Sequence, residues 1–219
     1  PGQENLYHLR GLAYVKVGRH ELGIKDFDKA LEIDPKQVAF YSDRGKAYIE
    51  LGNYWKAILD YSQAIEISPR TAERYYDRGL ANQRSGYYAK AIDDYSNTIR
   101  LDTKHEKAYL GRGEAYLITG KLVQSIKDFS KAIAFNQNWA VAYFNRGLSY
   151  QRLGNSNLAL QDYKTANRIE PDNQKFKKSM VEIESSISNP TTTSPNKSKN
   201  IVQDQSTKNG PSKLFVPIT

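Results

Sequence analysis

Apolar and small residues recur along the chain with helical spacing. Because residues at i, i+3, i+4 and i+7 fall on one face of a helix, the pattern predicts helices over residues 38–51 and 54–67. The expected buried faces carry Tyr41, Arg44, Gly45 and Tyr48 on the first helix and Ala57, Tyr61, Ala64 and Ile65 on the second. Gly52 is expected to end the first helix in the left-handed conformation, and Ser68-Pro69 to end the second. The segment therefore predicts a helix–turn–helix unit.

This unit occurs five times, and each copy begins 34 residues after the one before it, without insertions. Each copy has an Arg-Gly pair in its first helix, a glycine at the turn, and an aspartate followed by an aromatic residue in its second helix. The arginines are Arg10, Arg44, Arg78, Arg112 and Arg146, and the aspartates are Asp26, Asp60, Asp94, Asp128 and Asp162. The turn glycines are Gly18, Gly52, Gly86, Gly120 and Gly154. Internal repetition of this kind predicts a solenoid.

The glycine of each Arg-Gly pair lies inside a predicted helix, where it costs about 1 kcal/mol relative to alanine. Its recurrence indicates that packing offsets this cost. We expect the glycine and the small alanines to let two antiparallel helices approach closely, with the tyrosines of neighbouring units filling the remaining gaps.

The 34-residue step, with its Tyr, Gly, Tyr, then Ala, aromatic, Ala and a closing Pro, resembles the tetratricopeptide repeat (TPR) family. The resemblance implies an all-α, right-handed α-solenoid of five repeats over residues 4–37, 38–71, 72–105, 106–139 and 140–173, after a leader of residues 1–3. Residues that depart from the family pattern are Gly23, Asn82, Thr98, Thr103, Ser125 and Gln137. These departures bear on local stability rather than on the fold.

The arginine of each Arg-Gly pair is a feature of this chain, since the family usually has a leucine-like residue there. We expect an Arg–Asp ladder between helices, within one unit or across to the next, with the arginine stems lying between tyrosines. The alternative is a row of arginines that grips phosphate or RNA. A charge that recurs beside its counter-charge favours the structural interpretation.

The end of the chain differs from the repeats. Residues 174–188 form an amphipathic segment, which we interpret as a capping helix with a polar outer face. Residues 189–219 have a composition typical of a flexible tail, but they end in an apolar stretch, "KLFVPIT".

The composition of the chain excludes several kinds of functional site. The 219 residues carry a formal charge of +8 and contain no cysteine, so disulfides and cysteine nucleophiles are excluded. The three histidines have no metal or triad spacing, and no glycine-rich phosphate loop occurs. We expect no enzyme, no cofactor and no metal. Without an apolar signal or membrane segment, we expect a cytoplasmic protein.

The resemblance implies that the first helix of each repeat lines a concave groove that binds a peptide or protein segment. The candidate groove residues are His8, Leu12, Asp43, Lys46, Tyr76, Asp77, Leu80, Leu110, Glu114, Phe144, Asn145 and Leu148. No run of three units offers the Lys, Asn and Arg set with which some members grip a C-terminal carboxylate. The apolar members suggest a partner site, and the alternative is that they are buried between adjacent first helices. The acidic members favour a ligand with Lys or Arg beside its apolar residues.

The chain's own end has this chemistry, since a lysine precedes four apolar candidate ligand residues, Leu214, Phe215, Val216 and Ile218. The tail is a possible ligand of its own groove or of a second molecule; the alternatives are a disordered tail or a motif for another protein. The predicted function is a non-catalytic protein–protein interaction module, an adaptor, scaffold or assembly factor, whose partner the sequence does not identify. The alternatives are an RNA-binding solenoid, made unlikely by interleaved acids, and a self-assembly module strapped by its tail.

Overall fold

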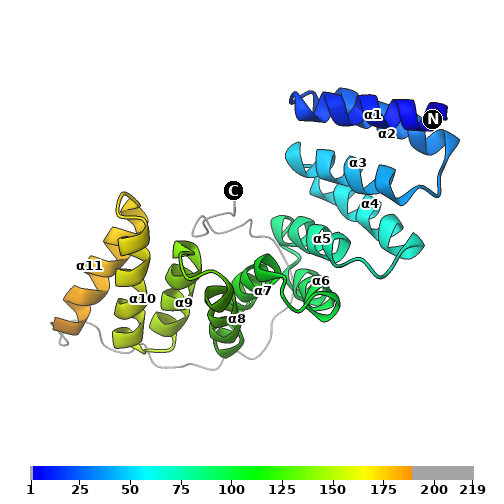
Figure 1. Ribbon diagram of the computed structural model, residues 1–219. Coiled ribbons are helices and arrows are strands. Elements are labelled where there is room, and N and C mark those ends of the chain that lie inside the picture. Colours follow the sequence, from blue (N-terminus) through cyan, green and yellow to red (C-terminus); the bar gives the residue numbers. More distant parts are fainter. Residues whose placement is uncertain (1, 189–219) are drawn as a thin grey trace, which may run out of the picture. The chain divides into compact units, whose positions relative to one another are not determined.

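The computed structural model describes residues 2–188, which form eleven α-helices and no strand within that range (Figure 1). The first eight helices are α1 (Gln3–Lys16), α2 (His20–Ile33), α3 (Val38–Glu50), α4 (Tyr54–Ile67), α5 (Ala72–Arg84), α6 (Tyr88–Leu101), α7 (Glu106–Ile118) and α8 (Leu122–Phe135). The others are α9 (Ala140–Arg152), α10 (Ser156–Ile169) and α11 (Gln174–Ser188). The all-α class is confirmed, whereas the repeat boundaries stay a prediction. The apolar tail residues lie outside the described range.

Consecutive helices pair through tight turns. The helices α1 and α2, α3 and α4, α5 and α6, α7 and α8, and α9 and α10 are joined in this way. All five turn glycines adopt positive φ angles, between 71° and 80°. Only glycine takes this conformation without strain, so the predicted helix ends are confirmed at these residues.

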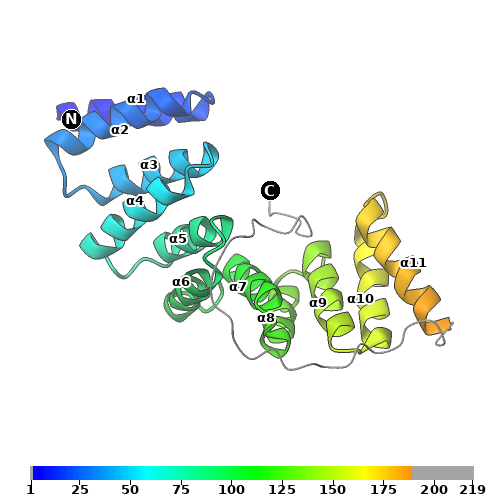
Figure 2. The same cartoon turned by 180° about the vertical axis from the view of Figure 1, so that it is seen from behind.

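The chain divides into two compact units. The first, Pro1–Phe135, holds α1 to α8. Within it, α2 packs against α3, α4 against α5, and α6 against α7, while α1, α3, α5 and α7 are neighbours in that order (Figures 1 and 2). This order places the first helix of each pair along one side of the unit, and we call that side the first-helix face.

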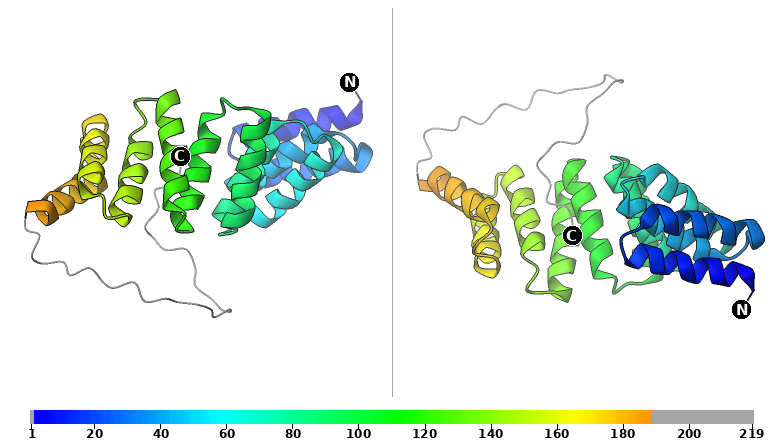
Figure 3. Two further views of the ribbon diagram at one scale, coloured as in Figure 1. Left: turned by 90° about the horizontal axis from the view of Figure 1, so that it is seen from below. Right: turned by 90° about the horizontal axis from the view of Figure 1, so that it is seen from above.

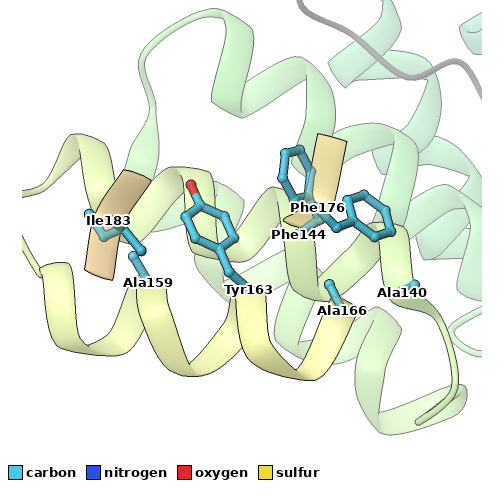
Figure 4. Close-up of a cluster of buried hydrophobic side chains, with 7 residues drawn as sticks. All are labelled: Ala140, Phe144, Ala159, Tyr163, Ala166, Phe176 and Ile183. Atoms are coloured by element: carbon cyan, nitrogen blue, oxygen red, sulfur yellow. The ribbon is translucent and has the colours of Figure 1, made fainter. Parts of the chain in front are cut away.

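The second unit, Asn136–Thr219, holds α9, α10 and α11. Figure 3 shows the helices of each unit from two further sides. The helix α10 packs against both α9 and α11, and Phe176 and Ile183 of α11 are buried. Figure 4 shows the core that results, in which Phe144 of α9 lies between Tyr163 of α10 and Phe176.

The glycines inside the first helices are explained by the aromatic residue of the paired second helix. A Cβ at Gly45 would lie 3.0 Å from the Tyr61 ring, and one at Gly147 would lie 2.7 Å from the Tyr163 ring. Both distances are far below ordinary carbon–carbon contact, so only glycine lets the ring lie against the helix backbone. The expected close approach is confirmed. The rings were expected from neighbouring units, but at these glycines they come from the second helix of the same pair.

Candidate functional site

The five arginines of the repeated Arg-Gly pairs each bind the aspartate of the paired second helix. Arg10 holds Asp26 through two hydrogen bonds of 2.7 Å, and Arg44 donates to both carboxylate oxygens of Asp60 at 2.9 and 2.6 Å. The pairs Arg78–Asp94, Arg112–Asp128 and Arg146–Asp162 repeat this geometry. The aspartate side chains are nearly inaccessible. The predicted Arg–Asp ladder is therefore confirmed.

The ladder also joins neighbouring helix pairs in the first unit. The second arm of Arg44 reaches Asp28 at 2.6 Å, and the corresponding arms of Arg78 and Arg112 donate to Ser62 and Ser96 of the preceding pair. Each arginine also lies against the ring of the tyrosine one turn before it, as the sequence led us to expect. Because their guanidinium groups are already bound to aspartates, these arginines do not offer a row of phosphate-binding groups.

Most of the predicted groove residues lie in the first unit, on its first-helix face. Leu12 and Lys46 are exposed, and His8, Asp43, Asp77 and Leu80 are half-buried. Tyr76, Leu110 and Glu114 are buried. Leu110 and Glu114 are thus covered in this structure, and the side chains that remain reachable are a mixture of apolar and charged groups.

The other three candidates, Phe144, Asn145 and Leu148, belong to the second unit. Phe144 is part of the core drawn in Figure 4, and Leu148 packs against that core. Asn145 is buried as well. The sequence predicts Phe144 in a groove, but in the structure its ring fills the space between α9, α10 and α11, where it packs against Tyr163 and Phe176.

Two histidines on the first-helix face are held by carboxylates. His8 Nε2 lies 2.7 Å from Asp43 Oδ2, and His105 Nε2 lies 3.2 Å from Glu73 Oε2. The hydrogen bond with His105 lowers the pKa of Glu73. Each pair joins two neighbouring first helices or their ends, since the partners are 35 and 32 residues apart.

Asp77 on α5 has a different environment. No basic side chain lies within ion-pair distance of its carboxyl in the described range. Burial, and next the nearby charge of Glu73, raise the pKa of Asp77 to about 7, while Lys46 acts in the opposite direction. A half-buried carboxyl with so perturbed a pKa is a candidate for a binding role.

Sequence reasoning missed three residues beside Asp77, namely Tyr61, Glu73 and His105. Tyr61 comes from α4, and its buried hydroxyl makes no hydrogen bond of good geometry in the described part of the chain, although it lies close enough to Asp77 for the two groups to shift each other's pKa. A comparison of the repeats could have indicated this, because the tyrosines equivalent to Tyr61 have a glutamine twelve residues earlier and Tyr61 has Ile49.

Among residues 2–188, no three His, Cys, Asp or Glu side chains are placed to hold a metal ion. A shallow pocket of about 300 Å³ in the first unit is lined by Ile58, Ser62, Arg78, Asn82, Lys90, Asp93 and Asp94. None of the predicted groove residues lines it.

Within residues 2–188, no helix combines the length and apolarity that crossing a bilayer requires.

Comparison with protein families identifies the fold. A model described as "TPR repeat" matches residues 11–52, 45–86 and 113–154, and one described as "Tetratricopeptide repeat" matches residues 140–173. The chain belongs to the tetratricopeptide repeat family. A search of curated proteins gives no significant match to this tetratricopeptide repeat protein.

Solved structures of other TPR-like proteins are similar to it. A crystal structure of MamA is 27% identical over 80% of this chain and 95% of that chain, with a TM-score of 0.73. YrrB, described as a TPR protein with an unusual peptide-binding site, is 20% identical over 82% and 90%, with a TM-score of 0.72. A tetratricopeptide repeat protein from Parabacteroides merdae is 16% identical over 85% and 75%, with a TM-score of 0.76. The last two likenesses show a shared fold.

Proposed function

We propose that this TPR protein is a non-catalytic interaction module, an adaptor, scaffold or assembly factor, that binds a peptide or protein segment along the first-helix face. The observation that carries the proposal is the composition of that face. Leu12, Lys46, Asp77 and Leu80 present apolar and charged groups side by side on neighbouring helices. Such a surface suits an extended segment with alternating apolar and basic side chains.

The contrast with the Arg–Asp ladder strengthens the proposal. The ladder residues recur in every copy and form ion pairs with one another, so their role is to stabilise the fold. The face residues differ from copy to copy: where α1 has Leu12, α3 has Lys46, α5 has Leu80 and α7 has Glu114. Variation at equivalent positions of a constant scaffold is what a specific binding surface requires.

RNA binding is the weaker alternative. The chain carries a formal charge of +8, but its recurring arginines are bound to aspartates, and the first-helix face holds Asp43 and Asp77. A phosphate backbone would meet these acids without a basic stripe to compensate. The same acids disfavour binding of an acidic C-terminal segment.

The apolar end of the chain is one possible ligand of this face, in the same molecule or in a second one. It supplies Leu214, Phe215, Val216 and Ile218 after a lysine. The similarity to YrrB, which is described as having a peptide-binding site, supports the search for a peptide ligand. The cytoplasmic location stays a prediction.

The test begins with a peptide-display selection against the full chain. The selected peptides and a peptide of residues 206–219 are then titrated into the wild type and into the Leu80→Asp variant. We expect peptides rich in apolar and basic residues whose affinity falls at least tenfold in the variant. The matched control is Leu158→Asp, an exposed leucine on α10 in the other unit. Selected peptides that bind the wild type and Leu80→Asp equally would refute binding at this face.

A further inference from the structure

Asp77 and Tyr61 form an incomplete polar site on the first-helix face. Tyr61 is fully buried, and its hydroxyl has no hydrogen-bonding partner within residues 2–188. The equivalent tyrosines Tyr95 and Tyr163 donate to Gln83 and Gln151 at 2.8 and 2.6 Å. Tyr61 has Ile49 in place of that glutamine, so its hydroxyl lacks the partner that the other two have. A buried hydroxyl without a partner is unfavourable, because it has lost its hydrogen bonds to water.

The repeat geometry shows where the Tyr61 hydroxyl points. The hydroxyl of Tyr95 lies 2.9 Å from the place where a Cβ at Gly111 would be. One repeat earlier, the residues equivalent to Tyr95 and Gly111 are Tyr61 and Asp77. The Tyr61 hydroxyl is therefore directed at the Asp77 side chain, and the charge of Asp77, after burial, raises the pKa of Tyr61.

Aromatic rings and charged groups of both signs surround Asp77, but none of the basic groups is in contact with it. Tyr76 is buried beside it, with its ring centroid 4.7 Å from that of His105. The neighbouring acids Glu73 and Asp43 already have histidine partners, His105 and His8. Lys46, on α3, is exposed and lies beyond ion-pair distance of Asp77. Asp77 is thus held in a half-buried, negatively charged place without a cation in contact.

We propose that Asp77 is the counter-ion for a basic side chain, Lys or Arg, of the segment that binds the first-helix face. The inference rests on the proposed function and names the chemistry of its ligand. When a bound cation keeps Asp77 ionised, its carboxylate is an acceptor for the Tyr61 hydroxyl on the buried side, which gives that hydroxyl the partner it lacks in this structure. Glu73 adds a second negative charge at the exposed edge.

A basic side chain suits this place better than the other possible occupants. An anionic group would be repelled by Asp77 and Glu73. A purely apolar group would bury the Asp77 carboxylate further without pairing it, which is unfavourable. A guanidinium or ammonium group pairs the carboxylate through charge-assisted hydrogen bonds and relieves the cost of its burial.

The first experiment uses small probes and the full chain. Nα-acetyl-arginine methylamide and Nα-acetyl-lysine methylamide are titrated into the ¹⁵N-labelled protein, with the citrulline analogue as a neutral control of the same shape as arginine. We expect shifts at the amides around Asp77, and an affinity for the arginine probe at least tenfold above that for the citrulline probe. In the Asp77→Asn variant the two affinities become equal.

A second readout needs no variant. The titration of the Asp77 carboxyl is followed by carbon-detected NMR with and without the arginine probe. We expect the pKa of Asp77 to fall when the probe is bound, because a cation stabilises the ionised form. An unchanged pKa, or equal affinity for arginine and citrulline, would overturn the proposal.

The display-selected peptides separate this inference from the proposed function. If they lose affinity in both Leu80→Asp and Asp77→Asn, both proposals stand. If they bind Asp77→Asn as well as the wild type but fail on Leu80→Asp, the face binds peptides without this counter-ion, and the inference is wrong. If neither substitution weakens binding, the face itself is not the site.

Discussion

At the scale of single residues, Asp77 shows how an otherwise regular repeat acquires an individual property. The equivalent position holds Leu9 in α1, Asp43 in α3 and Gly111 in α7. Asp43 gains His8 as a partner, and Gly111 leaves room for the Tyr95 ring. Asp77 has no histidine partner and is not replaced by glycine. Its ionised carboxylate is therefore less stable in the folded chain than in the unfolded one.

This difference predicts a pH dependence of stability. The pKa of Asp77 is about 7 in the folded chain and about 3.9 in an unfolded one. Between these values the folded state holds a proton that the unfolded state has released, so the free energy of unfolding falls as the pH rises from about 4 to 7. The slope from this group is at most about 1.4 kcal/mol per pH unit.

The measurement is urea unfolding of the wild type and Asp77→Asn at several pH values from 5 to 8. The variant is expected to gain stability relative to the wild type as the pH rises, since it lacks the titrating group. Glu73, Lys46, His105 and Tyr61 face Asp77 and are present in both proteins, so only the difference between the two curves is interpreted. Parallel curves would show that Asp77 titrates normally.

At the scale of helices, the spacing of the sequence predicted most of what the structure contains. The step of 34 residues located the helices, the turn glycines and the Arg–Asp pairs, because each depends on contacts within one repeat or between successive repeats. Phe144 packs on Phe176 of α11 as the equivalent residue His8 packs on Phe40 of α3, so its burial follows from the contact between successive first helices, which the groove assignment did not take into account. The Tyr61–Asp77 arrangement depends on a missing glutamine, which periodicity alone does not flag.

The ladder predicts unequal costs for equivalent arginines. Replacing Arg112 with Met leaves the carboxylate of Asp128, which is 5% exposed, without its cation, and we expect a loss of about 3 kcal/mol in the free energy of unfolding. Arg10 makes the same bidentate bond to Asp26, but its side chain is 57% exposed, so solvent replaces it more easily and Arg10→Met should cost less.

Denaturant unfolding measures the free energy of unfolding of both variants. The difference shows whether the contact with the preceding helix pair adds to the contribution of the Arg–Asp pair. If both substitutions cost the same, the pairing with the preceding helix pair, which Arg112 makes through Ser96 and Arg10 does not, contributes nothing. The double variant Arg112→Met with Asp128→Leu serves as control. It removes the unpaired charge and should recover part of the loss.

At the scale of the whole chain, one apolar face of α1 is unlike its equivalents. Leu6 and Leu9 are 58% and 59% exposed, whereas Phe40, the residue equivalent to Leu6 in α3, is 1% exposed. Phe40 is covered because α2 packs against α3. No helix of the described range covers Leu6 and Leu9 in this way.

Open apolar faces of this kind promote association, and the repeating interface offers a geometry for it. We expect the weight-average mass of the full chain to rise above 24.9 kDa with concentration in light scattering, and the Leu6→Lys, Leu9→Lys double variant to keep the monomer mass. The control is Trp55→Lys, because Trp55 is 63% exposed and lies on α4, away from this face of α1. A constant mass for the wild type would show that the face stays open in solution. An effect of Trp55→Lys equal to that of the double variant would instead indicate general hydrophobic adhesion.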